Sequence, residues 1–365
     1  MINTKRIIQN NTKQNDAIMS GDTKNGTGSR SNNKVLVTAA TGKAGYKICL
    51  ALVDAGFDVY GTTRSASKGA DKLKVIGVTP VIGDYTTELS TLLVDSGAHK
   101  LLFLTDYWTA AHGNVDVEVA QGKQMVDAAI SHNVEHAVFM SVADPDNFPK
   151  ECQHIPAKLQ IEAYLQEHSR HLNCWSVVRP AAFFENFDDA ANYNPLTKGS
   201  LKFLMTESLK WCSTYDIGRA AAVQLQNPTK WHGKTLDVIG YEGDLNDCAD
   251  ALETVGGFPV TRGLAVPLWL RKLVLGNDLH YMCEFFAGRR GPGIRGTVKE
   301  FQQHVPDAHD AAAWFRHHNM YANGEPIVGN AVPPSSGGVT RAAIAAVGMA
   351  TVVAAVAVVV ARKQS

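Results

Sequence analysis

The sequence predicts an α/β protein in which helices cover both faces of a parallel β-sheet, with a smaller α+β cap and a C-terminal transmembrane helix after it. Short β-branched or leucine-rich runs alternate with helical segments from residue 34 onward, and most of these runs end in a polar turn. Residues 342–361 carry no charge. Among 365 residues, 35 basic side chains balance 35 acidic ones, so no net charge favours nucleic-acid binding. Six cysteines are scattered without a CxxC pair, which predicts reduced, mostly buried thiols and no metal site.

The first segment, residues 1–33, is rich in Asn, Lys, Thr, Ser and Gly and has no apolar periodicity. This composition predicts a disordered arm. The arm lacks the apolar core of a secretory signal, and its few acidic residues leave an organelle presequence as an alternative.

The first βα unit follows this arm. Residues 34–37 form a short apolar run that predicts a buried strand, and Ile48 and Leu52 lie at helical spacing before Gly56. Backbone N–H groups and a helix N-terminus at such a glycine loop can hold a pyrophosphate. We therefore predict that a dinucleotide cofactor contacts the loop, although Ala39 replaces its usual first glycine. The alternative is a plain tight turn. The contacting residues would be Ala40, Thr41, Gly42, Lys43, Ala44 and Gly45.

A second strand, residues 57–63, ends at Arg64, about 20 residues beyond the loop, where an adenosine ribose would lie. An NAD-preferring site would offer a carboxylate there. Arg64 and Lys68 instead suit a 2′-phosphate, which favours NADP(H) over NAD(H). The alternative is a solvated basic turn. Asp84, after the third strand, would face the adenine or cap a turn.

The later elements continue the alternation. Polar and aromatic residues at the carboxyl end of the fourth strand would lie beside the nicotinamide, so we assign Thr105 to the cofactor and Tyr107 and Trp108 to a substrate pocket. Phe184, which follows the sixth strand, is assigned to the same pocket. The predicted segments are strands 78–82, 101–104, 136–142, 175–179 and 235–239, and helices 87–96, 115–132, from 156, 215–225, from 244 and between 264 and 286.

The pattern loosens after Phe187. We place the core of the sheet at residues 34–186, cap segments at 187–320 and a flexible linker at 321–341, which is rich in Asn, Gly, Pro and Ser. The next 20 residues, 342–361, would form a helix of about 30 Å, which matches a bilayer core. This predicts a tail anchor in the mitochondrial outer membrane or endoplasmic reticulum, with the large domain in the cytosol. A buried core helix or a strand-prone tail is the alternative.

Several motifs together resemble the NmrA-like family of atypical extended short-chain dehydrogenase/reductases. The resemblance covers residues 34–320 and implies a Rossmann domain that binds NADP(H), with Arg64 and Lys68 at the 2′-phosphate. It also implies that Lys158 lies near the ribose and the nicotinamide. Its motifs are residues 37–45, 62–64, 81–84, 103–108, 121–123, 139–142, 154–158, 179–186, 215–218 and 232–235.

Catalysis is the open question. Typical reductases of this wider group use Tyr-x-x-x-Lys, in which the phenol protonates a carbonyl as hydride arrives. Here His154 stands four residues before Lys158, and Pro156 predicts that the helix begins between them. His154 would be a catalytic acid, or a turn residue satisfied by the backbone.

Two functions remain, beside a third interpretation in which the chain is a scaffold with a vestigial pocket that binds no nucleotide. One is a redox-sensing module that binds a regulatory protein partner, as NmrA-like regulators imply. The other is an NAD(P)H-dependent oxidoreductase for a quinone-type hydride acceptor that needs no strong acid.

Overall fold

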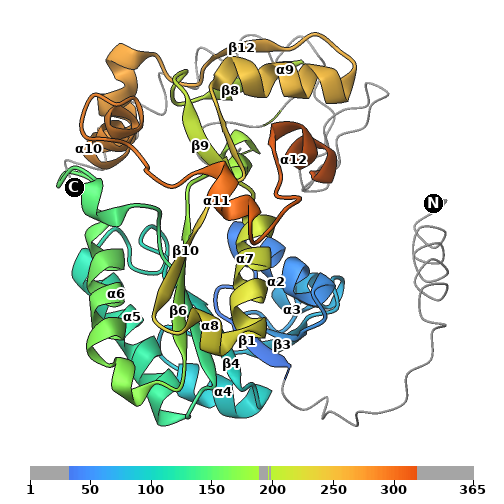
Figure 1. The fold of residues 1–365 in the computed structure, drawn as a ribbon, viewed down its shortest axis with the longest axis vertical. Helices are drawn as coiled ribbons and strands as arrows, with labels where there is room; N and C mark the ends of the chain where they lie inside the picture. Colours follow the sequence, from blue (N-terminus) through green and yellow to red (C-terminus); the bar gives the residue numbers. More distant parts are fainter. Residues whose placement is uncertain (1–32, 189–195, 197–198, 319–365) are drawn as a thin grey trace, which may run out of the picture. The chain divides into compact units, whose positions relative to one another are not determined.

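The main sheet has seven strands, all parallel, in the order β10-β6-β5-β4-β1-β2-β3 (Figure 1). The computed structural model describes residues 33–188, 196 and 199–318. The order reverses between β1 and β4, which makes their carboxyl ends the switch point of a doubly wound sheet. The strands are β1 (Lys34–Val37), β2 (Asp58–Thr63), β3 (Thr79–Ile82), β4 (Lys100–Leu104), β5 (His136–Met140), β6 (Trp175–Pro180) and β10 (Lys234–Val238).

Helices cover both faces of this sheet (Figure 1). Buried residues of α2, α3 and α7 pack with Val35 and Val37 on one face, and those of α4, α5 and α6 pack with Leu36 and Phe103 on the other. Helix α2 follows its apolar spacing, since Ile48 and Leu52 are fully buried. The helices are α2 (Lys43–Asp54), α3 (Lys68–Lys74), α4 (Leu89–Ser96), α5 (Val115–Ser131), α6 (Pro156–Glu167), α7 (Thr214–Gln226) and α8 (Pro228–Trp231). The predicted doubly wound sheet is confirmed.

A second core belongs to the cap. Aromatic side chains such as Trp211, Trp314 and Phe315 fill it, and each is at most 1% exposed. Its strands form a three-stranded sheet, β11-β9-β7, and a two-stranded one, β12-β8. The elements are β7 (Ala182–Phe183), β8 (Ser200–Phe203), β9 (Leu209–Cys212), β11 (Tyr241–Gly243), β12 (Thr261–Leu264), α9 (Leu245–Gly256), α10 (Leu268–Phe286), α11 (Val298–Gln302) and α12 (Ala311–His317).

The predicted boundary near residue 186 is wrong for part of the chain. Strand β10 pairs with β6 in the main sheet, with Leu236 opposite Val178, and α7 packs along α2. Gly218 of α7 permits this contact, because a Cβ there would lie 2.9 Å from the Cα of Ile48. The chain therefore leaves the main sheet after β6, builds part of the cap, and returns through α7, α8 and β10 before completing the cap.

All six cysteines are free and buried, as predicted. Across the part of the chain that the structure describes, no helix is long and apolar enough to cross a membrane. The predicted transmembrane helix 342–361, the linker 321–341 and residues 1–32 of the arm lie outside the described residues.

Candidate functional site

The loop between β1 and α2 lies at the switch point of the sheet. Its closest contact is at Gly45, where a Cβ would lie 2.1 Å from the carbonyl oxygen of Ala39. The N–H of Gly42 donates to the same oxygen over 3.0 Å. Only glycine at 45 lets α2 approach β1 this closely, so the N-terminus of α2 ends up beside the carboxyl end of the strand.

Ala39 adopts a left-handed backbone conformation, with φ at +50°. A side chain in this region costs on the order of 1–2 kcal/mol relative to the right-handed region. Alanine therefore takes the turn that glycine usually makes, and the loop closes despite the substitution.

Thr38 joins the loop to the neighbouring strand. Its hydroxyl donates to the carbonyl of Leu104 over 3.2 Å and accepts from the N–H of Leu104 over 2.9 Å. These two bonds hold the ends of β1 and β4 together, and they bring Thr105, the residue after β4, close to the glycine loop.

Basic side chains gather around the loop. Lys72 of α3 donates to the carbonyl of Thr41 over 2.9 Å, and its ammonium lies 4.6 Å from the centre of the Tyr46 ring. Burial lowers the pKa of Lys72, and the positive charges of Lys47 and Lys68 lower it further. Burial also lowers the pKa of Lys47, although Glu185 partly offsets it. Several positive charges beside one loop favour an anion there.

Of this cluster, sequence reasoning named Lys68 and missed Lys47 and Lys72, whereas Arg64 lies beside Asp84. Helical spacing was the available signal, since Lys72 lies one turn after Lys68 in α3 and Lys47 one turn after Lys43 in α2.

Asp84 caps a turn beside Arg64. One carboxylate oxygen accepts from the N–H of Thr86 over 2.9 Å and from its hydroxyl over 2.7 Å. Burial acts to raise the pKa of Asp84, but these bonds and the charge of Arg64 outweigh it, and the pKa is lowered. Of the two predicted roles, this geometry matches turn capping.

Lys158 meets a buried carboxylate behind the end of β4. Its ammonium donates to the carbonyl of Thr105 over 3.0 Å, to the Thr105 hydroxyl over 2.6 Å, and to Glu118 Oε1 over 2.7 Å. All three donors of the ammonium are therefore used within the protein. Glu118 is fully buried, and its Oε2 has no hydrogen-bond partner among the described residues. The structure thus brings Thr105 and Lys158 together, with Glu118 as a member that sequence reasoning missed. The signal was a carboxylate on the apolar face of the predicted helix 115–132.

His154 lies just before α6, which begins at Pro156 as predicted. Its Nδ1 pairs with Asp278 of α10, and its backbone N–H donates to the second oxygen of Asp278 over 3.1 Å. The rings of Tyr107 and Trp108 have their centroids 6.2 and 5.6 Å from the imidazole. Two predicted pocket residues therefore do meet the candidate acid. Asp278 carries no signal in the sequence, because it is 124 residues away from its partner.

Phe184 is placed differently from the prediction. It is fully buried in the cap, with its ring stacked on Trp211 and Trp314 at centroid distances of 5.6 and 5.5 Å. Its side chain belongs to the aromatic core of the cap, so the pocket role predicted for it is corrected.

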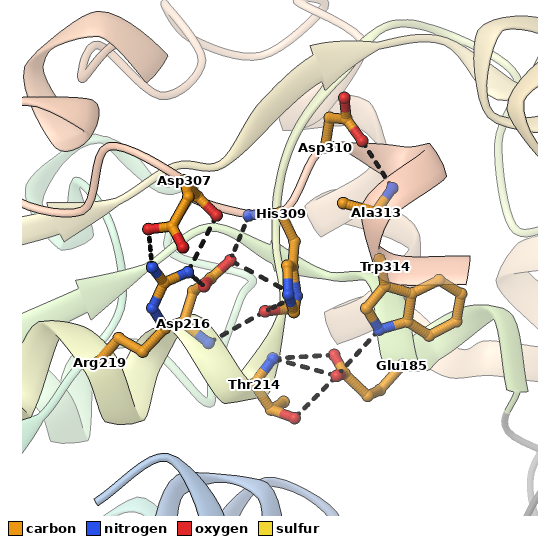
Figure 2. A network of polar contacts seen from close by, with 10 residues as sticks. Glu185, Thr214, Asp216, Arg219, Asp307, His309, Asp310, Ala313 and Trp314 are labelled. Atoms are coloured by element: carbon orange, nitrogen blue, oxygen red, sulfur yellow. Dashed lines mark hydrogen bonds and ion pairs between the residues drawn. The ribbon is translucent and has the colours of Figure 1, made fainter. Parts of the chain in front are cut away.

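A polar network fastens the cap to the sheet domain (Figure 2). Glu185 accepts from the N–H and hydroxyl of Thr214, at the start of α7, and from the indole N–H of Trp314 in α12 over 3.1 Å. Nearby, the buried Asp216 accepts from Arg219 over 3.0 Å and from the backbone N–H of His309 over 2.8 Å. Both carboxylates tie the C-terminal part of the cap to α7, the helix that packs on α2.

A groove of about 670 Å³ lies along β10, which forms the edge of the sheet opposite to the edge formed by β3. Four consecutive residues of the edge strand β10 line it, together with Trp231 of α8 and Phe301 of α11. None of the predicted site residues lines this groove.

Comparison with known proteins places the chain among Rossmann-type proteins. A model of the NmrA-like family matches residues 31–298. The crystal structure of NmrA, a negative transcriptional regulator, in complex with NADP is 17% identical and covers 79% of this chain and 95% of its own, with a TM-score of 0.59. An NADPH-dependent quinone oxidoreductase of Escherichia coli, complexed with NADPH, is 19% identical and covers 78% and 99%, with a TM-score of 0.58.

Two further relatives complete the comparison. The triphenylmethane reductase of Citrobacter sp., complexed with NADP(H), is 18% identical over 78% of this chain and 99% of its own, with a TM-score of 0.59. At these identities the likeness establishes the fold. A curated relative, Prestalk A differentiation protein A of Dictyostelium discoideum, is 32% identical over 65 residues, so the match spans about a fifth of that protein.

Proposed function

Because this chain belongs to the NmrA-like family, as its sequence motifs predicted, we propose that it binds NADP(H) and acts as a redox-sensing regulatory module held at a membrane. The observation that carries the proposal is the basic cluster around the glycine loop. Lys72 contacts this loop directly, and burial followed by the positive charges of Lys47 and Lys68 lowers its pKa. Crystal structures with a similar fold are complexes with NADP, NADPH and NAD.

The groups of such a cofactor fit the residues present. The N-terminus of α2, behind Gly42 and Gly45, would hold the pyrophosphate. Arg64 and Lys68 would hold the 2′-phosphate, with Lys72 beside them. Thr105 would lie beside the nicotinamide. Lys158 would act there by fixing Thr105 and Glu118, since its three donors are already used.

Titration of the full chain in detergent with NADPH and NADH, followed by nicotinamide fluorescence, tests the binding. We expect Arg64→Ala to weaken NADPH binding by about tenfold to a hundredfold and to leave NADH binding unchanged, because only NADPH carries the 2′-phosphate. Lys74→Ala is the matched control, since Lys74 lies on α3 with its side chain 61% exposed. Equal loss for both nucleotides would refute the assignment of Arg64.

The sensing role predicts different protein surfaces with NADPH and NADP⁺. Helix α10 is the element expected to respond, because Asp278 in it contacts the turn at His154. Hydrogen–deuterium exchange should therefore show different protection of α10 with the two nucleotides. Identical exchange at saturating concentrations of both would contradict sensing through this helix.

We propose that residues 342–361 anchor the chain in the mitochondrial outer membrane or endoplasmic reticulum, with the large domain in the cytosol. The uncharged run of 20 residues supports this. An exposed apolar ridge on α10 also supports membrane association. Trp269 is 83% and Leu273 61% exposed, and tryptophan is enriched at membrane–water interfaces. The full chain should resist alkaline carbonate extraction, and deletion of 342–361 should release it. Release of the full chain would contradict the anchor.

The second candidate function is an NAD(P)H-dependent oxidoreductase for a quinone-type acceptor. The observation that favours it is the pair of aromatic rings, Tyr107 and Trp108, beside His154 at the carboxyl end of β4. Saturable oxidation of NADPH in the presence of menadione would support it.

A further inference from the structure

We propose that His154 and Asp278 form an acid–base pair that protonates the oxygen of a planar, conjugated carbonyl compound during its reduction. The inference rests on the NADP(H) binding proposed above and adds an activity that the sensing role does not need. His154 is the catalytic acid, and Asp278 is its positioning residue.

Asp278 makes three polar contacts with the turn before α6. One carboxylate oxygen pairs with His154 Nδ1, and the other accepts from the His154 backbone N–H over 3.1 Å. The carbonyl of Asp278 accepts from the thiol of Cys152 over 3.8 Å. Asp278 and His154 are only 14% and 18% exposed. The imidazole is therefore fixed in position and in ring orientation.

This contact determines which nitrogen can deliver a proton. A carboxylate at Nδ1 keeps that nitrogen protonated and directs proton exchange to Nε2. Among the described residues, Nε2 has no hydrogen-bond partner of its own.

The surroundings of the imidazole indicate the class of acceptor. Trp108 is 53% exposed, so a planar conjugated molecule can stack on its indole. The ring of Tyr107 stands at 86° to that indole, with the two centroids 4.9 Å apart. Burial, together with the charges of Asp278 and Glu118, raises the pKa of Tyr107. Its phenol therefore stays protonated, and the imidazole is the group suited to release a proton.

The proposed step balances as follows. The acceptor C=O gains a hydride at carbon from the reduced nicotinamide and a proton at oxygen from His154 Nε2, and becomes CH–OH. In a quinone, the hydrogen added at carbon then moves as a proton to the second carbonyl oxygen, which gives the hydroquinone. The dinucleotide is oxidised by two electrons to NADP⁺. His154 is left neutral and regains its proton from water.

A purely structural clamp between α10 and the turn is the competing explanation, so the first readout does not depend on activity. Nitrogen-15 NMR of histidine-labelled full chain, assigned with His154→Gln, reports the tautomer of His154. We expect Nδ1–H in the neutral wild-type ring and in Asp278→Asn, whose amide oxygen still accepts. Asp278→Leu should lose it. An Nε2–H ring in the wild type would overturn the proposal.

The second readout is turnover of NADPH with menadione, phenanthrenequinone or benzaldehyde. We expect His154→Gln to lower kcat by about a hundredfold or more, and Asp278→Asn by about tenfold, with NADPH affinity unchanged. The wild-type rate should also fall in D₂O, and this isotope effect should vanish in His154→Gln. His132→Gln and Asp95→Asn, at exposed positions of α5's C-terminus and of α4, are matched controls.

Full activity in His154→Gln would overturn the proposal. So would a wild type that binds NADPH and reduces none of the three acceptors, and the sensing role would then stand alone. Failure to bind NADPH at all would instead refute the proposed function. Loss of activity in Asp278→Leu but not in Asp278→Asn, without an isotope effect in the wild type, would show a structural clamp.

Discussion

Replacing Lys158 with methionine should destabilise the protein strongly. The substitution keeps an apolar stem and removes the ammonium that neutralises Glu118, which is 2.7 Å away and fully buried. Glu118 would keep only the Thr105 hydroxyl, 2.6 Å from Oε1, because Oε2 has no partner among the described residues. Removing one partner of a buried ion pair costs about 3–5 kcal/mol, since the remaining charge is uncompensated.

Urea unfolding followed by circular dichroism measures this loss. The double variant Glu118→Gln/Lys158→Met should recover at least half of it, about 2 kcal/mol, because a neutral amide carries no uncompensated charge. Lys74→Met is the control. It breaks an ion pair with Asp71 whose side chains are 61% and 72% exposed, and should change stability by less than about 0.5 kcal/mol. A loss below about 1 kcal/mol in Lys158→Met would refute the reasoning, since Glu118 would then not depend on Lys158.

Three further predictions concern the loop and the cap. Gly45→Ala should abolish NADPH binding and lower the unfolding free energy by more than about 2 kcal/mol, because the new Cβ would lie 2.1 Å from the Ala39 carbonyl oxygen. The control Gly263→Ala has open space around the new Cβ and should be nearly neutral. Equal effects of the two substitutions would contradict this prediction. Ala39→Gly should raise the free energy of unfolding, measured in urea, by about 1 kcal/mol, because the backbone φ of residue 39 is +50°. A destabilised variant would refute the backbone strain at Ala39. Burial, then the charge of His309 and other neighbours, lowers the pKa of His317 from 6.5 to about 4. The unfolded chain binds the extra proton between these values, so stability should fall as pH drops from about 6.5 to about 4, and His317→Gln should flatten that slope; an unchanged slope would exclude His317 as its source.

Local signals in the sequence determined the first βα units of the sheet domain and several residues of the candidate site. A strand, a glycine loop and an apolar helical spacing lie within 23 residues, from Lys34 to Gly56, and the structure places them as predicted. Arg64 follows from the same local logic, because the residue after the second strand must lie near the loop of the first when the two strands are parallel neighbours. The family was also evident from motifs of this local kind.

The tertiary structure alone decided what the charged residues contact. Lys158 meets Glu118 across 40 residues, and His154 meets Asp278 across 124. Helical periodicity indicates which side of a helix is buried, but it does not indicate which distant side chain lies opposite.

The same reason explains the errors in the cap. Phe184 was predicted from its place after a strand, but the packing of Trp211 and Trp314 around it determined its burial. Strand β10 was assigned to the cap because it follows cap segments along the chain, whereas its hydrogen bonds to β6 return it to the main sheet. Sequence order determines the elements, while pairing between distant strands and charges depends on the free energy of the whole fold, which no single stretch encodes.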